Sequence, residues 1–292
     1  MRRAVVRGQW SGVSKKKLFA MFFISLFTIH CSLFTAYASD DFRKRKPQTE
    51  ESVGTEDDIK AEVLFGRELA ARILGKYSLY REESLSRYLN MVGKGMAQYT
   101  NRPEIEFRFA VLDTNMVNAF AAPGGYIFVT KGALAAMEDE AELAGVLAHE
   151  LAHVNERHIV KELNIKATDD SSAVSLARIL SGGTDTMKAA FLQMVDKAVE
   201  ILFEKGLKKQ DELDSDTIAT MTLASAGYDP SALSRYLSKI SVSEKEVRVL
   251  SGTHPSFEER IKGIESVLAE NRSTDSKPAV VKERFNENVR IK

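Results

Sequence analysis

Apolar residues recur at helical spacing between residues 59 and 99. A period of three to four residues places such side chains on one face of a helix. The run is interrupted near Gly75, so the pattern predicts two helices rather than one.

The period changes after Pro103, where apolar and polar residues alternate from Ile105 to Val111. Alternation with a period of two is typical of a half-buried strand. A second extended run at 126–130 follows a Pro-Gly-Gly turn signal at 123–125. The pattern therefore predicts two strands joined by an irregular loop.

Helical periodicity returns in the second half of the chain, and one predicted helix stops at the Gly227-Tyr228-Asp229-Pro230 signal. The predicted helices lie at about 139–157, 191–202, 207–226, 231–239 and 255–270. With the two strands, they predict a mainly helical α+β domain with a small sheet beside the helix at 139–157.

The N-terminal segment has the pattern of a secretory signal peptide. Six basic residues precede an apolar run that ends in the small-x-small sequence Ala36-Tyr37-Ala38. An uncleaved membrane anchor and lipidation at Cys31 are the alternatives. The predicted division is a signal peptide at 1–38, a flexible leader at 39–57, a domain at 58–272 and a polar C-terminal tail at 273–292.

Cleavage after Ala38 would change the composition in two ways. It removes six of the 41 basic residues and none of the 41 acidic ones, which leaves a net charge of −6. A chain without basic excess gives no reason to expect a nucleic-acid partner. The single cysteine is also removed, so a core rather than disulfides must stabilise the secreted protein. We expect a periplasmic or cell-envelope location.

The sequence His149-Glu150-Leu151-Ala152-His153 carries the most specific chemistry. Helical positions four apart share a face, so both imidazoles can bind one metal ion. Glu150 can then accept a proton from a water at that metal. Two nitrogens and one carboxylate suit a single Zn²⁺ with an open fourth position. The alternative is a helix with two surface histidines, but the flanking residues are apolar enough to bury it.

A third ligand is needed, and the predicted helix at 207–226 offers four carboxylates, Asp211, Glu212, Asp214 and Asp216. Glu212 and Asp216 share a face, so one can bind metal while the other accepts the N–H of a ligand histidine. By spacing alone, Asp211 or Asp214 serves nearly as well as Glu212. His158 lies nine residues after His149, half a turn round the helix, and is predicted to be structural.

Five sequence blocks occur in the order of a known peptidase family. They are NAFAAPGGYIFVT at 118–130, ELAGVLAHELAHV at 142–154, ELDSD at 212–216, AGYDP at 226–230 and THPS at 253–256. On these blocks the chain resembles the HtpX/Oma-type minigluzincin zinc metallopeptidases, especially short periplasmic relatives of the β-barrel assembly-enhancing protease. It departs at Asp214-Ser215, where the family usually has Glu-Ala, and it shows no long helical-repeat domain.

The resemblance implies the minigluzincin fold and assigns several residues. Glu212 matches the third zinc ligand and Asp216 its neighbouring acid. His254 matches a histidine that either stabilises the oxyanion or occupies the open zinc position, whereas the alternative is a loop histidine that caps the next helix. Asn118 lies near the same cleft without an assigned role. The substrate would pair with an edge strand formed by Tyr126, Ile127, Phe128 and Val129.

The expected function is that of a zinc endopeptidase, with Glu150 as general base and His254 assisting. By the resemblance, its substrates are unfolded or misassembled polypeptides of the bacterial cell envelope, with outer-membrane protein assembly components as candidate partners. One alternative is an envelope chaperone whose zinc site is held closed, and another is a zinc hydrolase of cell-wall peptides. Part of segment 165–205 is expected to cover the cleft as a lid.

Overall fold

The computed structural model describes residues 55–165, 183–243, 253–271 and 279–291. The predicted signal peptide and nearly all of the predicted leader lie outside the described residues, as do residues 166–182 of the predicted lid. All described residues belong to one compact unit, 46–292. None of the helices within these ranges is both long and apolar enough to cross a membrane.

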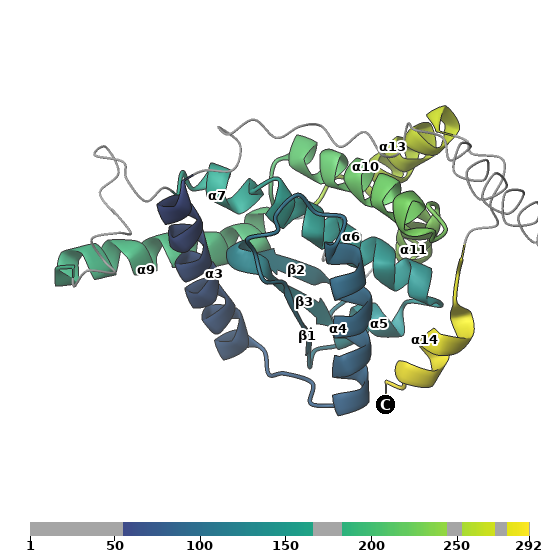
Figure 1. The fold of residues 1–292 in the computed structure, drawn as a ribbon, viewed down its shortest axis with the longest axis horizontal. Coiled ribbons are helices and arrows are strands. Elements are labelled where there is room, and N and C mark those ends of the chain that lie inside the picture. The colour runs from purple at the N-terminus through teal and green to yellow at the C-terminus, as the bar shows by residue number, and fades with distance from the viewer. Residues whose placement is uncertain (1–54, 166–182, 244–252, 272–278, 292) are drawn as a thin grey trace, which may run out of the picture. The chain divides into compact units, whose positions relative to one another are not determined.

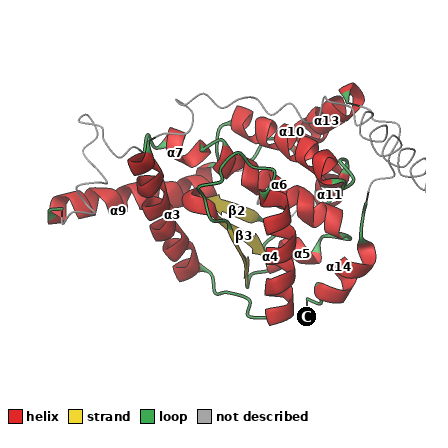
Figure 2. Cartoon of the chain, viewed as in Figure 1, coloured by secondary structure: helices red, strands yellow, loops and turns green. Residues whose placement is uncertain are grey.

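Helices surround a small sheet, which confirms the predicted mainly helical α+β class (Figures 1 and 2). The elements are α3 (Glu56–Lys76), α4 (Glu83–Ala97), β1 (Arg108–Leu112), β2 (Ala119–Ala122), η1 (Pro123–Gly125), β3 (Tyr126–Thr130), α5 (Lys131–Ala135), α6 (Glu140–Asn155), α7 (His158–Glu162), α9 (Asp185–Glu200), η2 (Ile201–Lys205), α10 (Lys209–Ala226), α11 (Ala232–Ile240), α13 (Phe257–Glu270) and α14 (Lys282–Asn288).

The sheet has three strands in the order β1-β3-β2. β1 runs parallel to β3, and β2 runs antiparallel to it. The Pro-Gly-Gly turn joins β2 to β3, and its Gly124 has a φ of 71°. A Cβ there would lie 2.8 Å from the Cα of Val63 in α3, so the turn needs glycine for two reasons. β3 coincides with the predicted strand at 126–130.

The two faces of the sheet bury two apolar cores. Val111, Ile127 and Val129 pack with α4, α6, α10 and α11. Phe120 and Phe128 point to the other face and pack with α3, α7 and α9. Strand side chains alternate between faces, so a short sheet can support helices on both sides. α6 is thereby enclosed, and only the last of its sixteen residues is not buried.

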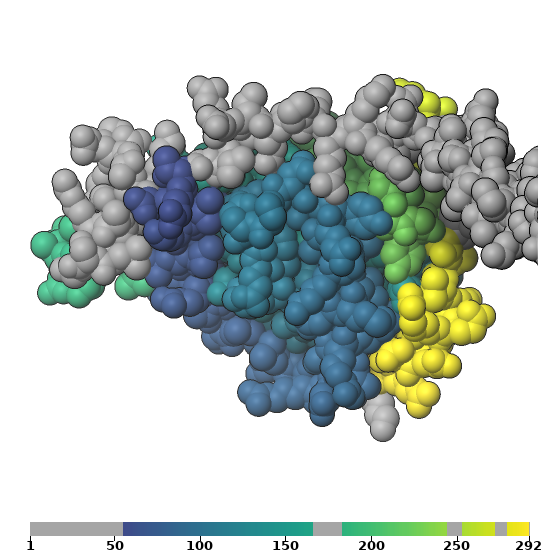
Figure 3. All heavy atoms as spheres, in the orientation of Figure 1, coloured from purple at the N-terminus to yellow at the C-terminus, as the bar shows by residue number. Residues whose placement is uncertain are grey.

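The N-terminal end of α6 is tied to the C-terminal part of the chain. The Asp139 side chain caps the helix by accepting from the Glu142 amide at 2.9 Å. Glu140, which is fully buried, accepts hydrogen bonds from Tyr88 and Tyr228 and pairs with Arg284 of α14. In the space-filling view, α14 lies directly beside α4 (Figure 3).

α14 falls within the segment that the sequence assigns to a polar tail. Its Phe285 is 3% exposed and belongs to the core around α4 and α6. Backbone bonds between Ala279 and both Gly227 and Asp229 attach the segment to the end of α10. Phe285, the Arg284 ion pair and these backbone bonds together attach the segment to the domain.

Candidate active site

α6 presents the two motif histidines on one face. The pair is almost completely buried, with His149 4% and His153 7% exposed. Their Nε2 atoms point toward each other at 3.0 Å. Two uncharged ring nitrogens at that distance, each with a lone pair, would repel unless a proton or a cation lay between them.

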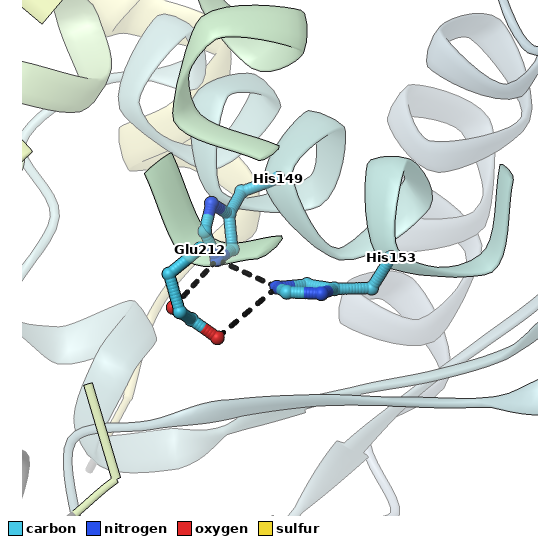
Figure 4. Close-up of side chains that lie close together, drawn as sticks. All are labelled: His149, His153 and Glu212. Atoms are coloured by element: carbon cyan, nitrogen blue, oxygen red, sulfur yellow. Dashed lines mark hydrogen bonds and ion pairs between the residues drawn. The ribbon is translucent and has the colours of Figure 1, made fainter. Parts of the chain in front are cut away.

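α10 brings Glu212 to the same point, as Figure 4 shows. Its Oε2 lies 3.6 Å from Nε2 of His149, and its Oε1 lies 3.5 Å from Nε2 of His153. The alternatives on this helix point elsewhere. Asp214 is exposed and accepts from Gln210, and Asp211 faces a different histidine. Glu212 therefore completes the triad.

The three ligand atoms fit a zinc ion. Ligands at the usual zinc distances and tetrahedral angles stand roughly 3.3–3.6 Å apart, close to the three separations of His149, His153 and Glu212. Oε2 of Glu212 is buried, and no described residue gives it a hydrogen bond. A buried carboxylate oxygen without a partner is costly, and a cation at the centre of the triad would satisfy it.

A carboxylate holds His149 from behind. Oδ1 of Asp216 lies 2.9 Å from Nδ1 of His149, so Nε2 is left for the metal. Arg260 of α13 donates two hydrogen bonds to this carboxylate, at 2.6 and 2.8 Å. Burial would raise the pKa of Asp216, but Arg260 outweighs it and holds that pKa far below the usual range. Asp216 therefore stands behind His149 as a charged acceptor.

His153 has different neighbours. Its Nδ1 lies 2.9 Å from Nδ1 of His158 and 3.5 Å from Oγ of Ser215. Burial lowers the pKa of His153 well below its usual value, and Glu212 opposes the shift only in part. His158 is outside the triad, and its contact with a ligand has no signal in the sequence.

A small pocket of about 30 Å³ opens beside the triad. Glu150, His153 and Glu212 line it, together with His254 and Leu202 of η2. Burial raises the pKa of Glu150 to about 7. Nε2 of His254 lies 3.5 Å from Oε2 of Glu212. The lid is predicted within residues 165–205, and η2 lies at the end of this segment. η2 borders the pocket through Leu202.

The predicted substrate strand needs a correction. β3, which contains Tyr126, Ile127, Phe128 and Val129, is the central strand and is paired on both sides, so it offers no free edge. Ala119 and Ala121 of β2 line the pocket instead. β2 has no strand signal in the sequence because its four residues include no β-branched side chain. Asn118 immediately precedes this strand, and its side chain accepts from the Ala119 amide.

Comparison with known proteins agrees with this geometry. Residues 83–268 match the sequence model of Peptidase family M48, which is more than half of the 292-residue chain. The chain belongs to peptidase family M48. The predicted resemblance and the predicted zinc ligands are thereby confirmed, because this member retains the complete His-His-Glu triad of a metalloendopeptidase.

Individual relatives are more distant. The chain is 26% identical over 245 residues to the Beta-barrel assembly-enhancing protease of Escherichia coli strain K12, which covers 80% of this chain and 48% of the relative. It is 29% identical over 190 residues to the Mitochondrial metalloendopeptidase OMA1 of Schizosaccharomyces pombe, covering 63% and 53%. The chain spans about half the length of these curated relatives.

Proposed function

We propose that this M48 family member is a zinc-dependent endopeptidase that cleaves unfolded or misassembled polypeptides in the bacterial cell envelope. The observation that carries the proposal is the triad of His149, His153 and Glu212, with an unsatisfied buried oxygen, at a pocket that also contains Glu150. This set supplies a metal site and a base, the two parts that peptide hydrolysis requires.

Each side chain has a role in the proposed mechanism. Zinc held by the triad would lower the pKa of a water molecule and polarise the substrate carbonyl. Glu150 takes the proton as the water oxygen bonds to the carbonyl carbon, and passes it to the amide nitrogen as the C–N bond breaks. His254, whose Nδ1 lies 2.8 Å from the Thr253 hydroxyl, donates from Nε2 to the developing oxyanion.

The substrate is proposed to bind as an extended strand along β2. The Thr130 amide donates to the Asn118 carbonyl, and ladder bonds of antiparallel strands alternate. The backbone groups of Ala119 and Ala121 therefore point away from β3, toward the side where these residues line the pocket. The Ala119 amide donates to the Asn118 side chain, so a substrate carbonyl would have to replace that side chain at this amide. Main-chain bonding there would select for unfolded segments rather than for one sequence.

The envelope location rests on two supports. The N-terminal 38 residues have the pattern of a cleaved signal peptide, before a leader at 39–57 and a domain at 58–272. One relative is a protease of Escherichia coli whose name refers to the assembly of β-barrel proteins. We therefore propose quality control of envelope proteins, with outer-membrane assembly components as candidate partners.

A second candidate is a chaperone or binding protein on the same fold with its site held closed. The small volume of the pocket, about 30 Å³, and the position of His254 beside Glu212 favour it. Gly206, after η2, also packs so tightly on the Thr253 backbone that a Cβ would lie 2.0 Å from the carbonyl oxygen. A loop fixed in this way would narrow access to the metal.

Casein digestion by purified protein, with zinc content measured in parallel, separates the two candidates. We expect Glu150→Gln to keep one zinc and to lose about 100- to 10,000-fold in cleavage rate. Glu156→Gln, a change at the end of α6 outside the pocket, is the matched control and should remain active. Zinc binding without cleavage by wild type would favour the closed chaperone, and absence of zinc would refute both.

A further inference from the structure

His158 contacts the zinc ligand His153 although it is no ligand itself. The two Nδ1 atoms are 2.9 Å apart, and the ring planes are inclined at 73°. His158 is 5% exposed, so water does not compete freely for this contact. A hydrogen bond between the two rings requires one nitrogen to donate and the other to accept.

The triad decides which nitrogen donates. Nε2 of His153 faces Glu212 and Nε2 of His149, so it must keep its lone pair for a metal. The ring proton of a neutral His153 then sits on Nδ1 and is donated to Nδ1 of His158. The proton of His158 is left on Nε2, which faces Oδ1 of Asp211 at 3.8 Å.

A break in the helix makes this contact possible. In a continuous helix His158 would project about 140° away from His153, because successive residues turn by about 100°. Instead α6 ends at Asn155, and Arg157 adopts a left-handed conformation with a φ of 59°. This conformation is uncommon for a residue other than glycine, and it turns α7 so that His158 folds back onto His153.

Buried contacts hold the break in place. Nε of Arg157 lies 3.1 Å from a carboxylate oxygen of Glu62, a residue that is fully buried in α3. Arg102, which is paired with the same carboxylate, donates to the Val154 carbonyl at 3.1 Å. Strained backbone that is fixed by its surroundings in this way is characteristic of functional sites.

We propose that His158 is a positioning residue for the metal site, which accepts the Nδ1 proton of His153 and so fixes that ligand's tautomer and ring orientation. The proposal rests on the proposed zinc site but goes beyond it, since it assigns a role to a residue outside the triad and the pocket. Ser215 is the other neighbour of His153 Nδ1, but its hydroxyl stands farther away, at 3.5 Å.

The test compares two substitutions of nearly the same shape. The first is His158→Asn, whose side-chain oxygen can accept where Nδ1 did, and the second is His158→Leu, which cannot accept. Zinc dissociation constants are measured on purified full-length protein by competition with a chromophoric chelator. We expect His158→Leu to weaken zinc binding about 10- to 100-fold and His158→Asn to stay within about threefold of wild type.

The opposite order would overturn the proposal. If His158 only fills space, the apolar variant should bind zinc at least as tightly as His158→Asn. If Ser215→Ala weakens zinc binding as much as His158→Leu, the hydroxyl rather than the imidazole is the partner of His153. If His158→Leu does not fold without zinc, His158→Gln takes its place as the variant without an acceptor at the Nδ1 position. The glutamine amide lies one carbon farther from the backbone and so reaches past that position.

These measurements are independent of cleavage. A wild-type protein that binds zinc, together with His158 variants that bind it equally well, would refute the positioning role and leave the proposed peptidase standing. A wild-type protein that binds no zinc would refute the proposed function itself.

Discussion

The two histidines of the metal site lie four residues apart on one helix, yet their surroundings differ in kind. His149 rests against the Asp216 carboxylate, whereas His153 rests against another imidazole, that of His158. Burial and Arg260 disfavour the charged form of His149, but Asp216 outweighs them and raises its pKa to about 9. Burial lowers the pKa of His153. The motif therefore holds two chemically unequal ligands.

The residues behind the two histidines also differ in their sequence distance from the motif. Asp216 and Arg260 belong to α10 and α13, and they bring distant segments against α6. His158 is only five residues from His153 and reaches it through one left-handed residue, Arg157. One ligand is thus held by tertiary structure and the other by a local break in the helix.

The largest loss of zinc affinity is expected at Glu212, which faces both histidines. Its carboxylate faces both histidines, so Glu212→Gln should lose more zinc affinity than the about 10- to 100-fold typical of residues behind a ligand. Zinc content after dialysis measures this. Asp214→Asn, an exposed change on the same helix, is the control, and equal zinc loss in both variants would contradict the assignment of Glu212.

A smaller effect on zinc, with an added cost in stability, is expected at Asp216. Asp216→Asn should weaken zinc binding about 10- to 100-fold, because His149 loses its carboxylate partner. The change also leaves the buried Arg260 charge without its partner, which should lower the free energy of unfolding by about 3–5 kcal/mol. Urea unfolding of the zinc-free protein measures the second effect separately from the first.

A double variant separates the two effects at Asp216. Asp216→Asn combined with Arg260→Met removes the unpaired charge, so stability should recover while zinc affinity stays low. Recovery of zinc affinity in the double variant would mean that Arg260, rather than the lost carboxylate, disturbs His149 in the single variant.

The difference between the supports also explains what the sequence can predict. The His-Glu-x-x-His spacing implies a shared helical face, and the family resemblance implies Glu212 and Asp216. Arg260 carries no such signal, because its role depends on how α13 packs across α10. A continuous helix would place His158 half a turn away from the metal. Nothing in the sequence marks Arg157 as left-handed, since neither glycine nor asparagine stands there.

The same limits apply to the fold. The helices α3 and α10 are predicted close to their observed bounds, and the glycine after α10 marks where that helix stops. β2 escapes prediction because strand identity there comes from pairing with β3 rather than from the residues themselves. Without β2, the strand at 126–130 resembles an edge, although it lies at the centre of the sheet. Strand order depends on long-range pairing, which periodicity does not encode.

The smallest change in zinc affinity is expected for a substitution of Arg157, at the break between α6 and α7. This variant tests whether the backbone conformation or the charge of Arg157 keeps His158 against His153. Glycine adopts a positive φ without the penalty of about 1 kcal/mol that other residues incur, so Arg157→Gly should keep His158 in place. That gain should offset much of the lost ion pair with Glu62. Zinc affinity, measured by the same competition, should remain that of wild type. A clear loss of affinity would mean that the Arg157 side chain, and not the left-handed turn, holds His158 against the ligand.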